Sequence, residues 1–246
     1  AAAQNIVKCI KRSGLDVMEL ILQPLASADA VLTNDEKELG VCLIDIGGGT
    51  TDIIVYKDGS VKHTAVIPIA GDQITNDISV AFRTPQQSAE EIKINYGCCD
   101  SDKASPREMI DVPLVDGRAP KKITIKDLSE IIEPRVNELF ELVINELIRS
   151  KLHNKIASGI VITGGSSLMN NITDVAEKNF KQSVRIGYPQ GISGLKQIIE
   201  NPRYATGIGL IKRGKLDFEN DKKRKIEGNS LIQIFEKMKL WFQGNF

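Results

Sequence analysis

The stretch VCLIDIGGGTTDIIVYK, residues 41–57, decides the fold of this chain. Its first apolar run, Val41–Ile44, predicts a strand that ends at Asp45, and a second run, Ile53–Tyr56, predicts a strand leaving the turn. The turn is polar and contains three consecutive glycines, although an ordinary two-residue hairpin turn does not need six polar residues. Glycine lets the backbone approach a bulky ligand and turn its N–H groups toward it. The stretch therefore predicts a loop that binds a nucleotide phosphate.

This turn supplies candidate ligands for a phosphate and for a metal ion. The phosphate candidates are its three glycines and the two threonines that follow: Gly47, Gly48, Gly49, Thr50 and Thr51. Asp45 is placed to hold Mg²⁺ through water, because Mg²⁺ keeps much of its hydration shell. The alternative is a flexible hairpin tip without a ligand. The chain contains no G-x-x-x-x-G-K-[ST] sequence, so a P-loop is excluded.

A second glycine site strengthens the phosphate interpretation. The apolar residues Ile160–Ile162 predict a strand that ends in the polar stretch TGGSS, residues 163–167, and helical spacing predicts a helix over Asn170–Phe180. A strand–Gly-Gly–helix junction would place a helix N-terminus beside a binding crevice. Two such loops on one sheet would hold the two ends of a nucleotide. Taken alone, the second site is better explained as a tight connection between a strand and a helix.

In this order the two sites resemble the second phosphate motif and the adenosine motif of the actin/Hsp70/sugar-kinase ATPase superfamily. Three further segments resemble its two interdomain connectors and its ribose-binding helix: QPLASA at 23–28, YATGIGL at 204–210 and AEEIK at 89–93. Other phrases resemble the FtsA family of bacterial cell-division proteins: AQNIVKC at 3–9, VIP at 66–68 and IEPR at 132–135. The resemblance covers nearly the whole chain except the charged stretch near 213–229.

The resemblance implies roles for individual residues and a cofactor, ATP with Mg²⁺. Glu90 and Lys93 would reach the sugar or the base. The adenosine would be bordered by Gly164, Gly165 and Ser166. Gln23 stands where many relatives have a residue that orients the attacking water, although it is equally well explained as a polar residue at a strand end. Any hydrolysis would be slow and regulatory, and we do not expect turnover from this chain, in which no first phosphate loop is found.

The alternation of strands and helices predicts an α/β fold. The resemblance specifies it as an actin-like (ribonuclease H-like) ATPase lobe with a mixed sheet and flanking helices. Ala1 is not a methionine and the chain opens in what reads as mid-helix, so we expect an N-terminally truncated piece. The expected units are a remnant of the first lobe (1–35), a large subdomain in two parts (36–76 and 129–212), a small subdomain (77–128), a flexible charged linker (213–229) and a terminal amphipathic helix (230–246).

Local signals complete the expected elements. Helices are predicted over Gln4–Ser13, Leu25–Leu32, Gln73–Phe82, Ser88–Tyr96 with Ser88 as its N-cap, Ile125–Lys151 as one or two helices around Pro134, and Arg203–Lys212. Further strands are predicted over Glu19–Gln23, Ser60–Pro68, Met109–Leu114, Lys122–Ile125 and Val184–Ile186, with Asp116-Gly117 as a hairpin turn.

Composition narrows the classes of function. Lysines plus arginines equal aspartates plus glutamates, 32 of each, which argues against a general nucleic-acid-binding protein. The four cysteines, Cys9, Cys42, Cys98 and Cys99, have no metal-binding spacing, and the pattern is typical of a reducing cytoplasm. No run of about 18 apolar residues is present that would span a membrane.

The C-terminal residues predict a membrane contact. Residues 212–228 are mostly charged, which predicts a flexible linker. Residues 230–246 then place large apolar side chains on one helical stripe: Leu231, Ile234, Phe235, Met238, Trp241 and Phe242. Such a helix suits the membrane interface, and the basic cluster at 222–225 would be attracted to anionic lipid. The alternative is a helix that docks on protein.

Together with the resemblance, these features imply a membrane tether for cell division. Its body would bind the C-terminal tail of the tubulin-like protein FtsZ, assemble into filaments and help recruit later division proteins. Its terminal helix would hold the complex peripherally on the inner face of the cytoplasmic membrane at the septum. The alternatives are another actin-like scaffold, shape-determining or pilus-type, and a sugar kinase or phosphatase of the same fold.

Overall fold

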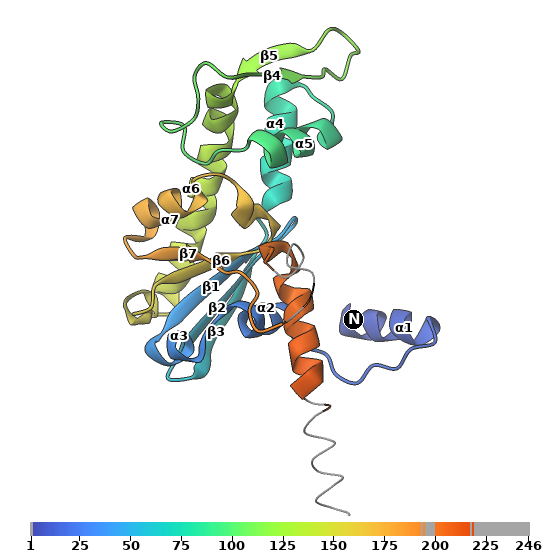
Figure 1. Cartoon of the computed structure of the whole chain (residues 1–246), viewed down its shortest axis with the longest axis vertical. Helices are drawn as coiled ribbons and strands as arrows, with labels where there is room; N and C mark the ends of the chain where they lie inside the picture. Colours follow the sequence, from blue (N-terminus) through green and yellow to red (C-terminus); the bar gives the residue numbers. More distant parts are fainter. Residues whose placement is uncertain (1, 193, 195–199, 217, 219–246) are drawn as a thin grey trace, which may run out of the picture.

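The computed structural model describes residues 2–192, 194, 200–216 and 218 of the 246-residue chain (Figure 1). A large subdomain is built around a five-stranded sheet, and a small subdomain of helices and one hairpin lies above it. The amphipathic segment predicted over 230–246 lies outside the described residues, as does most of the predicted linker.

The central sheet is mixed, with strand order β3-β2-β1-β6-β7. Its strands are β1 (Val41–Ile46), β2 (Thr51–Lys57), β3 (Ser60–Ile67), β6 (Ile160–Thr163) and β7 (Val184–Ile186). β2 runs antiparallel to both β1 and β3, whereas β6 is parallel to β1 and to β7. Every residue of β1 is buried, as expected for a central strand covered on both faces. Both predicted glycine loops follow strands of this sheet.

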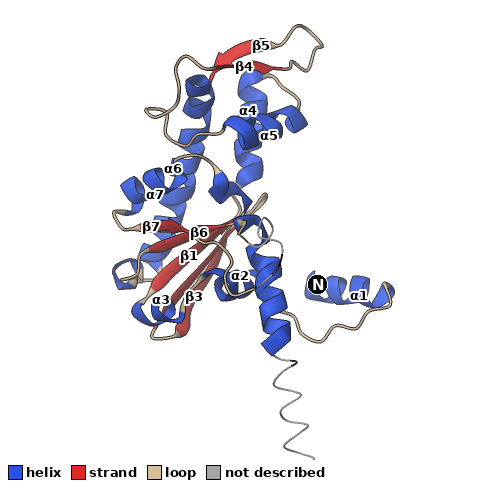
Figure 2. Cartoon of the chain, in the orientation of Figure 1, coloured by secondary structure: helices blue, strands red, loops and turns tan. Residues whose placement is uncertain are grey.

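Helices cover both faces of the sheet (Figure 2). The helices of the described chain are α1 (Ala2–Arg12), α2 (Gln23–Val31), α3 (Asn34–Leu39), α4 (Gly71–Phe82), α5 (Gln86–Tyr96), α6 (Ile125–Arg149), α7 (Ile172–Phe180) and a last helix over 205–216, and α1, α4 and α5 lie away from the sheet. Side chains of β1 alternate between two cores, because successive residues of a strand point to opposite faces. Cys42, Ile44 and Ile46 join the core on the α6–α7 side, whereas Val41 and Leu43 join the core on the side of α2 and the last helix.

The small subdomain contains α4, α5 and the antiparallel hairpin of β4 (Met109–Val112) and β5 (Lys121–Thr124). The hairpin confirms the two strands predicted on either side of Asp116-Gly117. Helix α6 begins beside the hairpin at a capping box formed by Thr124 and Asp127, and it continues down to the large subdomain. It is one helix of 25 residues that contains Pro134 in its interior, so Pro134 does not start a second helix.

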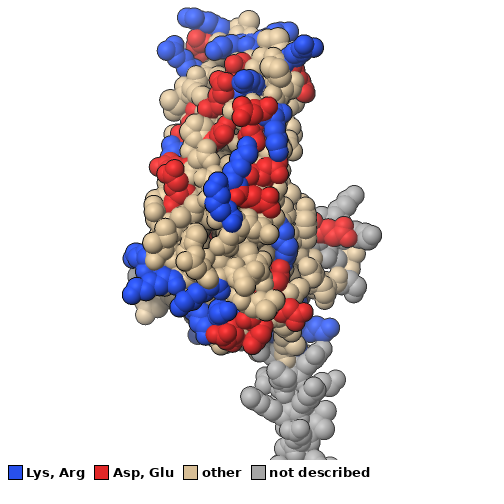
Figure 3. All heavy atoms as spheres, turned by 90° about the vertical axis from the view of Figure 1, so that its left-hand side faces the viewer, with Lys and Arg blue, Asp and Glu red and all other residues tan. Residues whose placement is uncertain are grey.

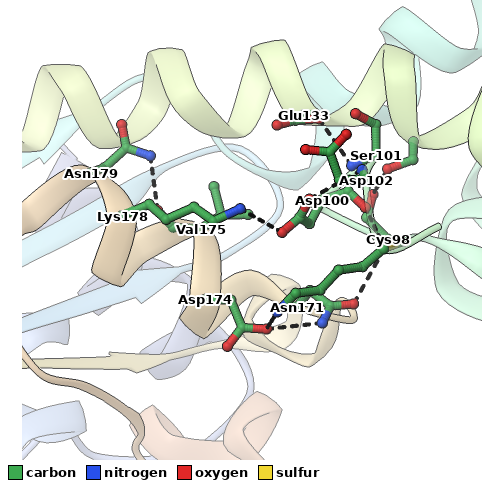
Figure 4. A network of polar contacts seen from close by, with 12 residues as sticks. Cys98, Asp100, Ser101, Asp102, Glu133, Asn171, Asp174, Val175, Lys178 and Asn179 are labelled. Carbon is green, nitrogen blue, oxygen red and sulfur yellow. Dashed lines mark hydrogen bonds and ion pairs between the residues drawn. The ribbon is translucent and has the colours of Figure 1, made fainter.

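Residues 97–104 form a strap that joins the two subdomains (Figure 4). The buried carboxylate of Asp100 accepts a hydrogen bond from Lys178 on α7 at 2.8 Å. The amide of Ser101 donates to Glu133 on α6 at 3.0 Å, and Lys103 pairs with Asp174 at 2.7 Å. The strap therefore connects the end of α5 to both α6 and α7. Cys98 and Cys99, next to Asp100, are buried free thiols.

Several local predictions were wrong. Residues 15–22 form no strand, and Gln23 begins α2, because this exposed segment has no neighbouring strand to pair with among the described residues. Helix α5 begins at Gln86 with Pro85 as its N-cap, so Ser88 lies inside it. Helix α3, capped by Thr33 and Glu36, was not predicted. The last helix continues to residue 216, so the first residues of the predicted linker are helical.

Two glycines of the last helix give a matched test of its packing. A Cβ on Gly209 would lie 1.7 Å from the carbonyl oxygen of Ala26 on α2, whereas a Cβ on Gly207 would meet nothing within 4 Å. We expect Gly209→Ala to destabilise the protein by about 1–3 kcal/mol through overpacking. Gly207→Ala should be neutral or stabilise it by up to about 1 kcal/mol, because alanine favours the helix. Thermal unfolding of the two variants measures the difference, and equal midpoints would contradict this packing.

Candidate functional site

A cleft of about 370 Å³ lies at the carboxyl ends of β1 and β6, where the small subdomain meets the large one. Both glycine loops line it, together with the start of α2, the start of α4, one face of α5 and the start of the last helix. Its lining residues are Gln23, Asp45, Gly47, Gly48, Gly71, Asp72, Glu90, Lys93, Ile94, Gly164, Gly165, Ser166, Leu168, Met169, Arg203 and Thr206. Crevices at the carboxyl ends of strands are the usual ligand sites of open α/β sheets.

Direct contacts hold the two glycine loops together. The hydroxyl of Ser166, in the second loop, donates to the carbonyl of Gly47 in the first at 3.0 Å. The same carbonyl accepts the amide of Gly71 at 3.1 Å, at the start of α4. A Cβ on Gly71 would lie 2.6 Å from the Ser166 Oγ, so a side chain at this three-way junction would displace the Ser166 hydroxyl. The sequence predicts two separate loops, and the structure brings them into contact.

Lys93 and Glu90 form a polar pair on α5 that faces the cleft. The Lys93 side chain is buried, and its ammonium donates to the Gly71 carbonyl at 2.9 Å and to the Thr75 hydroxyl at 2.8 Å. It also pairs with Glu90 at 2.6 Å. Burial would raise the pKa of Glu90, but hydrogen bonds from Lys93 and Thr75 hold it below its ordinary value. The pair therefore presents a fixed carboxylate and a fixed ammonium at one wall of the cleft.

Asp45 is a buried carboxylate at the floor of the cleft. It is 3% exposed and accepts hydrogen bonds from Ser27 on α2 at 2.6 Å and from Thr206 at 3.4 Å. Burial raises its pKa. Asp52 stands opposite it on β2, and its pKa is raised by burial and by the charge of Asp45. Two carboxylates facing each other in a buried sheet are costly unless a cation or a proton balances them.

The oxygen donors in the cleft fit Mg²⁺ held partly through water. Asp45, Gln23 and Asp72 line one cavity, and carboxylate and amide oxygens are the ligands that Mg²⁺ accepts. No group of three or more His, Cys, Asp or Glu residues in the described part of the chain could bind a metal directly. A Mg²⁺ ion here would therefore depend on water and on a ligand such as a phosphate.

Three of the predicted phosphate residues do not line the cleft. Gly49 and Thr50 are exposed at the tip of the loop. Thr51 is buried at the start of β2, and its hydroxyl donates to the carbonyl of Ile69 at 2.7 Å. Its side chain thus holds the base of the hairpin instead of facing a ligand. The second loop also differs from the expectation, because a short 3-10 helix, Gly165–Leu168, follows the glycines and α7 begins only at Ile172.

Several residues of the cleft were not predicted from the sequence. Arg203 is exposed there, and its guanidinium Nε lies 3.9 Å from the position of a Cβ on Gly165. Asp72 donates its amide to the Gly48 carbonyl at 2.8 Å, and Thr206 reaches Asp45. The Gly71-Asp72 pair at a predicted helix start was a usable signal. No sequence signal marked Arg203, because its position in the cleft depends on the path that the chain takes after β7.

The comparisons with known proteins agree with this geometry. The family model described as "Cell division protein FtsA" matches residues 42–209, more than half of the chain. This chain belongs to the FtsA family. It is 49% identical over 251 residues to cell division protein FtsA of Pseudomonas aeruginosa, and 45% identical over 252 residues to that of Neisseria meningitidis. Each alignment covers 100% of this chain and 60% of the relative, so the chain spans about three fifths of these relatives.

A solved structure shows the same fold. MreB5 of Spiroplasma citri, in a crystal structure bound to ADP, superposes with a TM-score of 0.73 over 89% of this chain and 67% of that one, at 22% sequence identity. The predicted actin-like α/β fold and the predicted family are therefore confirmed.

The burial of Asp45 makes a prediction about how the stability of the protein depends on pH. Its folded-state pKa is raised above the ordinary value of 3.8, so the folded protein binds a proton more tightly than the unfolded chain. The free energy of unfolding therefore falls as the pH rises from the ordinary pKa of Asp45 through its raised folded-state pKa, and it stays lower at neutral pH. We expect Asp45→Asn to raise the unfolding midpoint more at pH 7.5 than at pH 4, relative to the unmodified chain.

The matched control is Asp58→Asn at the exposed β2–β3 turn. This variant removes the same charge without a buried carboxylate, so its effect should stay within about 0.5 kcal/mol at both pH values. A uniform loss of stability in Asp45→Asn at both pH values would contradict the burial cost assigned to Asp45.

Proposed function

We propose that this chain is the nucleotide-binding and membrane-tethering part of an actin-like cell-division protein. The observation that carries the proposal is the cleft in which the two glycine loops meet against the Lys93–Glu90 pair. Membership of the FtsA family supplies the division context. The nucleotide would be ATP with Mg²⁺, and MreB5 of the same fold has been solved bound to ADP and to AMPPNP.

The cleft residues divide into three groups around the proposed nucleotide. Backbone N–H groups of the 47–49 loop would hold phosphate, and Mg²⁺ held by Asp45 through water would neutralise phosphate charge. Glu90 and Lys93 would contact the ribose or base, and Gly164, Gly165 and Ser166 would border the adenosine. The exposed guanidinium of Arg203 lies beside Gly165, where it can stack on a planar base.

Gln23 is the proposed water-orienting residue. It stands at the first position of α2 and lines the cleft together with Asp45. A neutral amide can position a water molecule but is a weak base, which suits slow, regulatory hydrolysis. No turnover is proposed for this chain.

Lys93 tests the nucleotide proposal. We expect Lys93→Ala to weaken ATP binding in the presence of Mg²⁺ by about tenfold or more, because hydrogen bonds to a charged group contribute about 1.5–3 kcal/mol. Isothermal titration calorimetry measures the affinity. Lys103→Ala is the matched control, because Lys103 lies on the strap, outside the cleft, and pairs with Asp174 on α7.

Lys93 is buried, so Lys93→Ala is also expected to destabilise the protein. Arg203→Ala is the second variant: because Arg203 is exposed, its replacement should lower the affinity for ATP without unfolding the protein. Nucleotide binding that stays unchanged in both variants would reject the proposed role of this cleft.

The proposed tether would use the small subdomain and the C-terminal segment of the chain. The FtsZ tail would bind the small subdomain near residues 77–128, and the segment 230–246 would lie in the membrane interface. Filament formation and contacts with later division proteins would multiply these weak attachments. No helix in the described part of the chain is long and apolar enough to cross a membrane. The proposed attachment is peripheral, on the inner face of the cytoplasmic membrane at the septum.

A vesicle-recruitment experiment tests the tether. We expect the full chain to carry a fluorescent FtsZ C-terminal tail peptide onto phosphatidylglycerol vesicles, and the chain ending at Gly228 to bind the peptide without carrying it there. Co-sedimentation with and without added salt measures both steps. Recruitment by both chains would reject residues 230–246 as the anchor, and peptide left in solution with membrane-bound protein would reject the FtsZ contact.

A further inference from the structure

Four lysines gather at the end of the central sheet that is opposite the cleft. The glycine loops follow the carboxyl ends of β1 and β6, so the residues that precede β6 and β7 lie at the other end of the sheet. These residues include Lys151 and Lys155 before β6 and Lys181 before β7, and Lys57 ends the antiparallel strand β2 at the same end. We call Lys57, Lys151, Lys155 and Lys181 the lysine end.

Contacts between these turns confirm that they meet. A Cβ on Gly40, just before β1, would lie 2.3 Å from the Lys155 carbonyl oxygen and 3.3 Å from the Lys57 Cδ. The Gln182 amide donates to the His153 carbonyl at 3.0 Å, which joins the turn of Lys181 to the turn of Lys151 and Lys155. In the view of Figure 3, basic side chains gather at the lower end of the body, with acidic side chains beside them.

The charges of the lysine end are not ion-paired with neighbouring acids. Within the described part of the chain, none of the four ammonium groups forms an ion pair. Lys151, Lys155 and Lys181 are exposed, and Lys57 donates to the carbonyl of Leu39. Two acids at this end have other partners: Glu36 pairs with Arg185 at 2.7 Å and Asp58 with Lys62 at 3.7 Å. Asp35 and Glu38 on α3 are the exposed acids at the flank.

Helix stabilisation explains only part of this arrangement. Lys151 and Lys181 follow the C-termini of α6 and α7 with φ of 59° and 55°, and cations are favourable at such ends. Lys57 ends a strand and Lys155 ends a 3-10 helix, so neither is at the end of an α-helix. Helix ends therefore do not account for the cluster as a whole, and a ligand outside the described chain would give it a use.

The path of the last helix indicates what that ligand is. Thr206 lines the cleft, Gly209 contacts Ala26 and Lys212 donates to the carbonyl of Asp29, so the helix runs alongside α2, away from the cleft. It ends at the same end of the sheet as the lysine end (Figure 1). The chain therefore continues toward residues 230–246 from the end of the body that carries the unpaired lysines.

We infer that the lysine end is a second membrane contact, which lies against the phosphate groups of anionic lipids while residues 230–246 insert beside it. This inference rests on the proposed membrane tether. Lysines near an anionic surface each add about 1 kcal/mol of attraction, and a planar surface can meet turns from three separate segments together. The contact would orient the body with the cleft and the small subdomain away from the membrane.

The test compares two full-length variants with the same change of charge. In the first, all four residues of the lysine end become glutamine: K57Q, K151Q, K155Q and K181Q. In the control, four basic residues of the small-subdomain hairpin region at the opposite end of the molecule become glutamine: R107Q, R118Q, K121Q and K122Q. We expect the first variant to bind phosphatidylglycerol vesicles at least ~25-fold more weakly at low salt, the factor reached if only two of its four lysines contribute ~1 kcal/mol each. The control should bind like the unmodified chain, and neither should change on phosphatidylcholine vesicles.

Three results would decide against the inference or its premise. Unchanged binding of the first variant, or an equal loss in the control, would overturn the lysine end as a lipid contact while leaving the terminal anchor intact. Full binding by the chain ending at Gly228 would instead reject the anchor of the proposed function. If the first variant unfolds, the double variant K57Q and K155Q spares both α-helix ends, and an approximately 25-fold loss is still expected.

Discussion

The close approach of Gly71 to Gly47 and Ser166 is the constraint on which the cleft depends. The Gly47 carbonyl accepts both the Gly71 amide and the Ser166 hydroxyl, so one oxygen joins the first loop, the start of α4 and the second loop. Lys93 then reaches the Gly71 carbonyl from α5 and fixes the small subdomain against the same point. A side chain at Gly71 would disturb this junction, because its Cβ would lie 2.6 Å from the Ser166 Oγ and displace that hydroxyl.

Asp45 shows the opposite arrangement, in which a residue is kept although it destabilises the fold. The carboxylate is buried beside Asp52, and its pKa is raised by that burial. Ser27 and Thr206 satisfy one of its oxygens from the two helices that cover this face of the sheet. An apolar residue would suit this position better as packing, and the proposed Mg²⁺ site gives a reason for the charge. Such conflicts between local stability and sequence are expected at functional sites.

The sequence predicted the features that depend on local periodicity and missed those that depend on tertiary contacts. The runs around Val41 and Ile53 and the hairpin at Asp116-Gly117 were found, because apolar spacing and turn residues specify them directly. The strand expected over Glu19–Gln23 failed, because a strand exists only where a neighbouring strand pairs with it. In the cleft, Gly47 and Gly164 were visible as motifs. Arg203 and the Ser27–Thr206 contact were not visible, because distant parts of the chain converge there: Ser27 and Thr206 are 179 positions apart.

The strap at residues 97–104 has a mechanical consequence. Helix α5, which carries Glu90 and Lys93, ends directly in this strap, and the buried Asp100 can leave Lys178 only by exposing or stranding its charge. Helix α6 crosses the same junction without a break. A hinge between the two subdomains at this point would have to break both. We therefore expect a force on the β4–β5 hairpin to move the small subdomain as a rigid body, so that α5 tilts at the cleft with little bending between the hairpin and the cleft.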